Sequence, residues 1–173
     1  MNQFDSHPTI RPAADSRDFS EIGLLMREYL TELGVDLCFQ DFEGEVADLP
    51  RTYAAPDGAL LIARAEIDPS SRHQPTDRAA AAGCVALRRV GDTLCEMKRL
   101  YVRPAHRGSG LGRRLVEAAL DRAREMGFSR VCLNTVVPKM PTAVALYRSM
   151  GFVEIEPFDC HPVDGTLAMG RPL

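Results

Sequence analysis

The sequence predicts one α/β domain, spanning residues 1–173, that contains a pair of parallel strands. Its length suits one domain with a single sizeable core, and 45% hydrophobic with 26% charged residues is ordinary for a globular protein. Between Leu94 and Val136, a strand-like segment, a glycine-rich turn, an amphipathic helical segment and a second strand-like segment follow one another. Two strands joined through such a helix normally run parallel, with a right-handed crossover.

The N-terminal segments predict a strand and a helix. Residues 8–13 have strand character, and their second proline places the strand at an edge or ends it early. A helix is expected over residues 16–33, because Asp15 or Ser16 is a suitable N-cap and Gly34 a suitable stop. Apolar side chains recur at helical spacing along it: Ile22, Leu25, Met26, Tyr29, Leu30 and Leu33.

Residues 41–102 predict one weak helix and three strands. The weak, acidic helix covers residues 41–49 and ends before a proline. An apolar strand over residues 58–66 is followed by a polar, proline-containing loop over residues 68–78. Strands over residues 81–89 and 94–102 are then joined by a turn at a Gly-Asp pair.

The clearest helix of the sequence covers residues 111–126 and ends at Gly127. Its apolar positions form a stripe that predicts burial on one side only. The stripe and its neighbours are Leu111, Leu115, Val116, Ala118, Ala119, Leu120 and Ala123, whereas Arg113, Glu117, Asp121 and Arg124 point away.

The C-terminal segments predict three strands and a short helix. Residues 131–136 have the apolar composition of a buried strand. Pro141 opens the short helix at a position where proline is tolerated, and Gly151 closes it. The last strands are expected over residues 152–155 and 166–169.

Composition restricts the class of protein and its compartment. A net charge of -3 gives no general reason to expect nucleic acid as a partner. No apolar run is long enough to span a membrane, and residues 1–7, which we expect to be disordered, lack a secretory signal pattern. The five cysteines include no CxxC pair, and the four histidines show no ligand spacing, so we expect neither disulfides nor a metal site and place the protein in the cytoplasm.

Two basic pairs, Arg88-Arg89 and Lys98-Arg99, lie within predicted strands. We interpret them as solvated strand positions or ligand contacts, because a nucleic-acid-binding stripe would need more basic and aromatic residues on one face.

The glycine-rich turn at residues 107–112 (RGSGLG) predicts an anion site at the start of the clearest helix. Glycines allow close approach of a ligand, and free N–H groups with the helix dipole favour a pyrophosphate. Arg107, Arg113 and Arg114 are positioned to add contacts to phosphate. A P-loop would require a lysine after the glycines, and a Rossmann fingerprint would require glycine at Arg113, so neither nucleotide motif fits.

The pattern Arg-x-x-Gly-x-Gly, at Arg107, Gly110 and Gly112, resembles motif A of the GNAT acetyltransferases. Residues 100–104 (LYVRP) resemble the family's fourth strand and its exit, and residues 145–152 (ALYRSMGF) resemble its motif B. The resemblance implies the GNAT fold: a twisted, mostly antiparallel sheet of six to seven strands, with a splayed parallel pair formed by strands 4 and 5, and about four helices.

The resemblance also implies acetyl-coenzyme A as co-substrate, with no metal. Pyrophosphate would bind the glycine turn, and strand 4 would pair with the pantetheine arm. One segment departs from the family, because residues 135–140 are one residue longer than usual and Met140 stands where many relatives have an asparagine. The implied cofactor-binding residues are Leu100, Tyr101, Val102, Arg107, Gly108, Ser109, Gly110, Leu111, Gly112, Arg113, Asn134 and Met140.

The resemblance makes Glu96 the candidate general base that frees the acceptor amine of its proton, directly or through water. Strand alternation would put it on one face with Lys98, Leu100 and Val102. The alternative is a surface glutamate paired with Lys98 or Arg99, and Asn134, an amide, would orient substrate or water.

Tyr147 is the implied proton donor to the coenzyme A thiolate, and its alternative role is that of an amphipathic tyrosine at the edge of the core. The function predicted is therefore direct acetyl transfer, in a ternary complex, to a primary amine of a small molecule or peptide. A non-catalytic module that binds acetyl-coenzyme A and passes on a regulatory signal is the alternative. The acceptor and the possibility of a homodimer stay open.

Overall fold

A computed structural model describes residues 8–34, 41–65, 80–158 and 164–173. The predictions for residues 1–7 and 68–78 therefore lie outside the described residues. The strands are β1 (Thr9–Pro12), β2 (Gly58–Arg64), β3 (Ala81–Arg89), β4 (Leu94–Val102), β5 (Arg130–Val136), β6 (Val153–Glu154) and β7 (Thr166–Pro172). The helices are α1 (Ser16–Leu33), α2 (Phe42–Ala47), α3 (Leu49–Thr52), α4 (Leu111–Glu125) and α5 (Pro141–Ser149), with a 3₁₀ helix over Pro104–His106.

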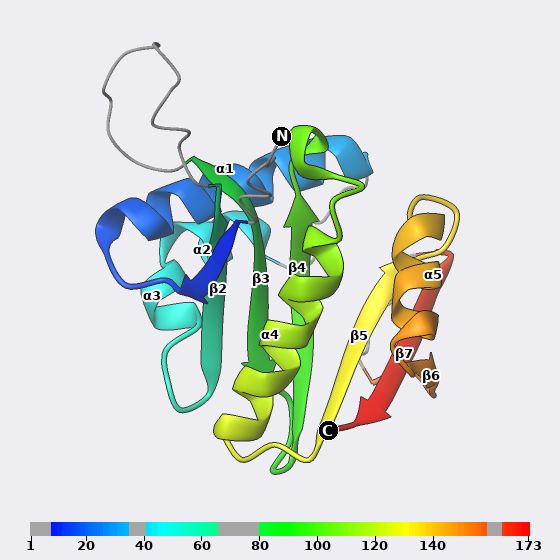
Figure 1. Cartoon of the computed structure of the whole chain (residues 1–173). Coiled ribbons are helices and arrows are strands. Elements are labelled where there is room, and N and C mark those ends of the chain that lie inside the picture. Colours follow the sequence, from blue (N-terminus) through cyan, green and yellow to red (C-terminus); the bar gives the residue numbers. More distant parts are fainter. Residues whose placement is uncertain (1–7, 35–40, 66–79, 159–163) are drawn as a thin grey trace, which may run out of the picture.

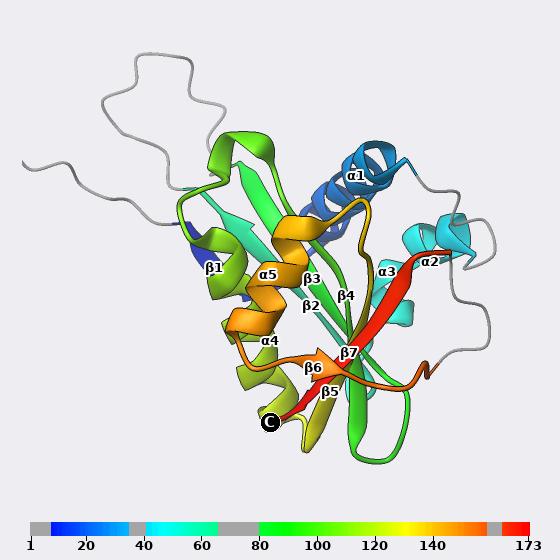
Figure 2. The ribbon, with the colours of Figure 1, turned by 90° about the vertical axis from the view of Figure 1, so that its right-hand side faces the viewer.

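The strands form one twisted sheet of seven strands in the order β1-β2-β3-β4-β5-β7-β6 (Figure 1). β4 and β5 run parallel, and the other neighbouring strands pair antiparallel. Helices α4 and α5 lie on one side of the sheet, and α1, α2 and α3 lie on the other (Figure 2). The predicted α/β class, the mixed sheet and its single parallel pair are confirmed.

Helix α1 begins and ends where its sequence predicts. The Asp15 carboxylate accepts a hydrogen bond of 2.9 Å from the backbone N–H of Asp18, which caps the first turn. Gly34 follows in the left-handed conformation and donates its N–H to the Leu30 carbonyl. This helix is therefore fixed by local signals at both ends.

The predicted helix over residues 41–49 is in fact two short helices, α2 and α3. The helix is interrupted at Asp48, whose backbone is not helical. Its side chain accepts a hydrogen bond from the Arg51 N–H. Pro50 lies in the first turn of α3, where its missing N–H costs nothing, so it starts a helix instead of ending one. The described helices therefore number five instead of four.

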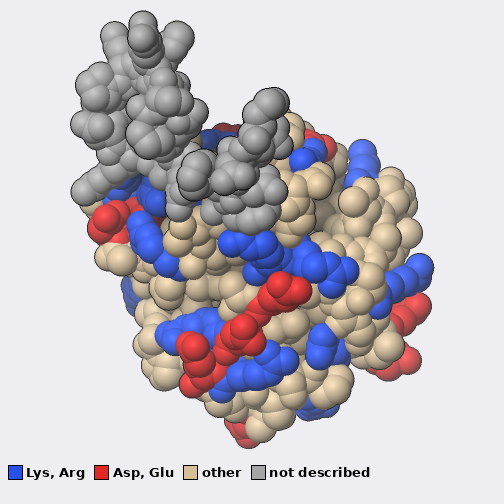
Figure 3. Space-filling model, viewed as in Figure 1, with Lys and Arg blue, Asp and Glu red and all other residues tan. Residues whose placement is uncertain are grey.

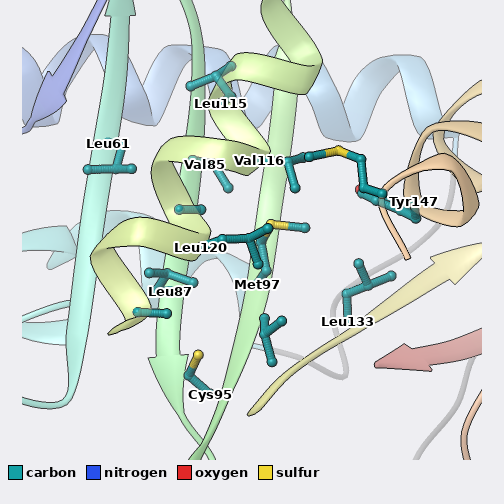
Figure 4. Close-up of a cluster of buried hydrophobic side chains, with 14 of the residues drawn as sticks. Leu61, Val85, Leu87, Cys95, Met97, Leu115, Val116, Leu120, Leu133 and Tyr147 are labelled. Atoms are coloured by element: carbon teal, nitrogen blue, oxygen red, sulfur yellow. The ribbon is translucent and has the colours of Figure 1, made fainter. Parts of the chain in front are cut away.

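Helix α4 buries the predicted stripe against β3 and β4. Figure 4 shows Leu115, Val116 and Leu120 packed with strand residues such as Val85 and Met97. The opposite side of α4 carries ion pairs, including Asp121–Arg124 at 2.7 Å, and Figure 3 shows acidic and basic side chains interleaved over this face. One-sided burial confirms the amphipathic pattern.

The other side of the sheet has its own core. Ile22, Leu25 and Met26 of α1 pack with Phe42 of α2 and with Ile62 of β2. All five side chains are buried, so α1 is held by apolar contacts along its predicted stripe. The sheet consequently separates two apolar clusters.

The C-terminal strands differ in length from the prediction. β6 is reduced to Val153–Glu154, whereas β7 extends to Pro172 and pairs with β5 along seven residue pairs, from Arg130 to Val136. The extension brings the last residues of the chain into the sheet, although their glycine and proline give no strand signal in the sequence. The 3₁₀ helix after β4 was also not predicted.

A bulge in β4 corrects the predicted arrangement of side chains. Cys84 of β3 pairs with Tyr101, and Ala86 pairs with Lys98, so Arg99 and Leu100 together oppose one residue of β3. Arg99 adopts a φ of 56°, in the left-handed region that non-glycine residues seldom occupy.

Because the bulge resets the alternation, Leu100 and Val102 pack on the α4 side of the sheet, whereas Tyr101 packs on the α1 side. Met97 lies on the α4 side, so its neighbours Glu96 and Lys98 point to the α1 side. The prediction that Glu96 shares a face with Leu100 and Val102 is therefore wrong.

The parallel pair is splayed, as the resemblance implies. Pairing between β4 and β5 covers only three residue pairs and stops at Glu96 with Cys132. Beyond that point β4 stays paired with β3 and β5 stays paired with β7, so the two strands diverge (Figure 1). Among the described residues, none pairs as a strand with the facing edge of β4 after Glu96.

Candidate active site

A cavity of about 510 Å³ lies where β4 and β5 diverge, which is a usual volume for a small-molecule site. Its walls come from the end of α1, the end of β4, the glycine turn with the start of α4, and the start of α5. The structure thus brings together four segments that are far apart in the sequence. Ten of the twelve predicted cofactor-binding residues line it: Leu100, Tyr101, Val102, Arg107, Gly108, Gly110, Leu111, Gly112, Arg113 and Met140.

The glycine turn has the backbone that its sequence predicts. Gly108 and Gly110 have φ angles of 78° and 79°, which a side chain would strain. Gly110 is the N-cap of α4, no side chain caps this end, and the first turn carries no acidic residue. The N-terminus of α4 therefore offers backbone N–H groups and the positive end of the helix dipole to an anion.

Two arginines flank this turn. Arg107 donates from Nε to the Val102 carbonyl at 2.9 Å and from its terminal nitrogen to Glu32 at 2.7 Å. The hydrogen bond from Arg107 holds the pKa of Glu32 below its ordinary value. Arg113 donates to the Ser149 hydroxyl at 2.7 Å. Both guanidinium groups are solvent-exposed at the edge of the cavity, within a site that favours negative charge.

The cavity fits an extended ligand with an anionic group at one end and amide groups along its length. The uncapped start of α4 suits the anion, and the unpaired edge of β4 suits the amides, because amides complete strand pairing. At Gly112 an added Cβ would lie 3.7 Å from Leu146 and 3.9 Å from Val102, so glycine leaves room between α4 and α5. A pantetheine arm with its pyrophosphate has these properties.

Two predicted cofactor-binding residues do not line the cavity. The Ser109 hydroxyl donates to the His106 carbonyl at 2.8 Å, so it stabilises the turn from within. Asn134 is half-buried on β5, paired in register with Ala168 of β7. Neither position is brought to the cavity wall.

Tyr147 is buried in the apolar cluster beneath α5, with its ring centre 5.6 Å from that of Phe152. It does not line the cavity, although Ala143 and Leu146 of the same helix do. Burial, assisted by the neighbouring Tyr29, raises the pKa of Tyr147 above its ordinary value. The phenol is protonated at neutral pH, as any ordinary phenol is, and the raised pKa makes it a weaker acid.

Glu96 is buried instead of lying on the surface. Its carboxylate accepts a hydrogen bond of 2.7 Å from Arg88, and its Oε2 lies 4.0 Å from the Lys98 ammonium. Its main partner is thus Arg88, which the sequence did not identify. Glu96 does not line the cavity, so the structure does not bring it together with Tyr147 there.

Arg99 holds the bulge of β4 through a buried ion pair. Its guanidinium donates to both carboxylate oxygens of Glu45, at 2.9 and 2.7 Å, and Tyr53 donates to the same carboxylate at 2.6 Å. Since both charged side chains are more than nine-tenths buried, Arg99 is not the solvated strand position that the sequence suggested. The bidentate pair offsets the cost of the left-handed backbone.

Helix α1 supplies cavity residues that the sequence did not identify. Tyr29, Glu32 and Leu33 line the cavity, and the Tyr29 hydroxyl donates to the Met140 sulfur at 3.8 Å. Tyr29 and Leu33 belong to the apolar stripe that predicted the helix, and periodicity cannot separate a cavity wall from a core contact. The remaining lining residues are His106, Lys139, Pro141, Thr142, Ala143 and Leu146.

The described cysteines lack the exposed, low-pKa thiol that a nucleophile requires. Cys84, Cys95 and Cys132 are buried, and burial raises the pKa of the Cys84 thiol to about 12. Within the described ranges, no group of three or more His, Cys, Asp or Glu side chains is placed to hold a metal ion. In the same ranges, no helix combines the length and the apolar character needed to span a membrane.

A splayed parallel pair with an uncapped helix at its mouth defines a class of α/β protein that binds an extended, phosphate-bearing ligand. The model of the "Acetyltransferase (GNAT) family" matches residues 27–152, which is more than half of the chain. The chain therefore belongs to the GNAT acetyltransferase family, and this family uses acetyl-coenzyme A. The resemblance seen in motifs A and B is confirmed.

Relatives support the same family. The chain is 38% identical over 154 residues to an uncharacterised N-acetyltransferase of Schizosaccharomyces pombe, covering 88% of this chain and 87% of that protein. It is 36% identical to an IAA acetyltransferase of Azospirillum brasilense over 71% of this chain and 73% of that protein. A solved acetyltransferase from Streptococcus agalactiae shares the fold, with a TM-score of 0.75, 20% identity, and coverage of 98% and 100% of the two chains.

Proposed function

We propose that the protein is an N-acetyltransferase that transfers the acetyl group of acetyl-coenzyme A directly to a primary amine of a small molecule or peptide. The observation that carries the proposal is the cavity, which connects the uncapped start of α4 with the unpaired edge of β4. Acetyl-coenzyme A, when bound, supplies an activated acetyl thioester. The family and the geometry of this cavity both support its use.

In this proposal the binding residues have separate tasks. The N–H groups at Gly110 and the start of α4 bind the pyrophosphate, and Arg107 and Arg113 add positive charge beside it. The backbone of Leu100 to Val102 holds the pantetheine arm in line with the strand. These contacts orient the acetyl group and exclude water from it.

Two side chains are proposed to move protons. Tyr147 donates a proton to the departing thiolate, a role that rests on its place in the motif B match. Glu96 accepts the proton of the amine through water, since the carboxylate is buried away from the cavity wall. Tyr29, at the wall, is placed to orient the reacting groups.

The test measures release of the coenzyme A thiol from acetyl-coenzyme A with a panel of primary amines. Replacing Tyr147 with Phe should lower kcat by roughly 10²-fold or more, with little change in the KM for acetyl-coenzyme A. Tyr53→Phe is the matched control, because Tyr53 is equally buried but lies on the other side of the sheet. Its kcat should stay close to that of the unmodified protein.

Equal loss of kcat in both tyrosine variants would contradict the donor role of Tyr147. Binding of acetyl-coenzyme A without thiol release for any amine would instead favour the non-catalytic module.

A further inference from the structure

Met140, in the cavity wall, is held by hydroxyl groups from both sides of the sheet. Its sulfur accepts a hydrogen bond from the Tyr29 hydroxyl at 3.8 Å and from the Thr135 hydroxyl at 3.7 Å. Thr135 belongs to β5, where strand alternation puts it on the side of α4 and α5 together with Leu133. Tyr29 belongs to α1, on the opposite side (Figure 2). Because paired strands would separate the two hydroxyls, the sulfur lies at the opening between the diverging strands β4 and β5.

The segment that carries Met140 is fixed at several points. The backbone N–H groups of Lys139 and Met140 both donate to the Val136 carbonyl, at 3.0 and 2.9 Å, which defines the turn after β5. A Cβ added at Gly34, at the end of α1, would lie 3.9 Å from the Lys139 ammonium, so this segment reaches α1 at a second place. Thr135 is only 2% exposed, so its hydroxyl cannot turn to water. These contacts hold the Met140 side chain across the opening.

Met140 adjoins the end of the cavity that receives the thioester in the proposed function. With the pyrophosphate at the start of α4 and the arm along residues 100–102, the acyl group lies at the other end of the ligand. Burial raises the pKa of Tyr147, and the nearby Tyr29 adds to this effect, so the two phenols are neighbours. Since Tyr147 is the proposed proton donor to the thiolate and Tyr29 contacts Met140, the thioester and Met140 come together there.

We propose that Met140 limits the size of the acyl group, so that the donors are coenzyme A thioesters of acetyl or of a group of similar length. This role rests on the proposed function and specifies its donor. A side chain held across the opening occupies the space into which a longer acyl chain would extend. Packed groups move little to admit additional methylenes, and one methylene in an apolar pocket changes binding by roughly tenfold or more.

The experiment measures the Kd of acetyl-, butyryl- and hexanoyl-coenzyme A by calorimetric titration, so it does not depend on finding the acceptor amine. The unmodified protein should bind acetyl-coenzyme A at least roughly tenfold more tightly than hexanoyl-coenzyme A. Met140→Ala should reduce this ratio to about threefold or less, because it removes the thioether part of the side chain. Met140→Leu should keep the ratio, because it nearly conserves the volume.

Met150→Ala is the matched control, since Met150 is a buried methionine at the end of α5 that does not line the cavity. It should lower the melting temperature and leave the ratio of the two Kd values unchanged. Equal affinity of the unmodified protein for all three thioesters would overturn the role of Met140. An unchanged ratio in Met140→Ala, or the same change of ratio in Met150→Ala, would overturn it as well.

Release of the coenzyme A thiol, measured with the same thioesters and a panel of primary amines, separates this role from the proposed function. Equal binding of all three thioesters, with thiol release from each, would overturn the size limit and leave the transferase activity standing. A size limit in binding that Met140→Ala removes, without thiol release for any amine, would support the role of Met140 and contradict catalysis. Failure of every thioester to bind would contradict both.

Discussion

The side of the sheet under α4 and α5 and the side under α1, α2 and α3 bury different kinds of side chain. The first side buries an apolar cluster of aliphatic residues, three aromatic rings and methionines. Among the described residues, Asp18, Glu45, Glu96 and Arg99 are buried charges, and all four belong to the second side. The side under α4 and α5 is therefore held by apolar packing, whereas the other side also depends on ion pairs.

The difference shows that the sequence can specify the two sides of one sheet in different ways, by a continuous stripe of residues or by pairs of distant residues. The contacts of α4 follow from one continuous amphipathic stripe beside the glycine turn. The ion pairs join residues 46 and 54 positions apart, as in Asp18 with Arg64 and Glu45 with Arg99. Buried charges must be matched one by one, so this side is the more sensitive to single polar substitutions.

The largest effect is expected from breaking the buried pair of Arg99. Arg99→Met should cost about 4 kcal/mol of unfolding free energy, because it leaves the Glu45 carboxylate buried without its bidentate partner. The double variant with Glu45→Gln should recover much of that loss, as urea unfolding can measure. A loss of under about 1 kcal/mol in the single variant would show that the pair does not hold the bulge.

A somewhat smaller effect is expected from a cavity in the apolar side. Leu115 of α4 is fully buried, so Leu115→Ala should cost about 3 kcal/mol through lost transfer energy and an unfilled void. The same urea titration compares it with Arg99→Met. Since Leu115→Ala leaves no buried charge without a partner, the loss of unfolding free energy should be similar at pH 5 and pH 8. A strong pH dependence of that loss would contradict apolar packing as its cause.

Asp18 should contribute stability that depends on pH. Burial raises its pKa, but hydrogen bonds from Arg11 and Arg64 outweigh burial and hold the pKa well below the ordinary value of 3.8. The ionised carboxylate therefore stabilises the fold above about pH 4, and this stabilisation is lost as the pH falls further.

Asp18→Asn should accordingly lower the unfolding free energy by about 2 kcal/mol at pH 7, compared with the unmodified protein. The difference between the two proteins should be smaller near pH 3. Thermal unfolding at a series of pH values measures the difference. An equal loss at both pH values would show that the charge of Asp18 is not what matters.

The smallest effect is expected on the exposed side of α4. Asp121 pairs with Arg124 at 2.7 Å, but its side chain is 72% exposed. Water screens such pairs, so Asp121→Asn should change the unfolding free energy by under about 0.5 kcal/mol. A loss close to that of Asp18→Asn would contradict the distinction between buried and exposed pairs.

The sequence predicts most of the strands and helices because their signals are local. Asp15 and Gly34 bound α1, and two segments of strand character on either side of a turn signal define β3 and β4. The bulge at Arg99 is not predictable in this way, because it depends on a partner on α2. The bulge is also why the predicted face of Glu96 was wrong.

The candidate site shows the same division between residues with a local sequence signal and residues placed by tertiary contacts. The glycine turn and the end of β4 are contiguous motifs, and most of their predicted residues line the cavity. Tyr29 and Glu32 reach the cavity only through the packing of α1, and the Arg88 partner of Glu96 comes from the neighbouring strand. Such contacts are set by tertiary structure, so a single sequence gives no signal for them.

The central claim is that the turn at Gly108 to Gly112 and the start of α4 bind acetyl-coenzyme A. Thermal unfolding with acetyl-coenzyme A, and with NAD and ATP as controls, tests it most directly. At a hundred times its Kd the ligand should add about 2.7 kcal/mol, which for this length means a rise of roughly 5–11 °C. The rise should occur with acetyl-coenzyme A alone and be largely lost in Gly110→Glu; no rise, or an equal rise with NAD, would contradict the claim.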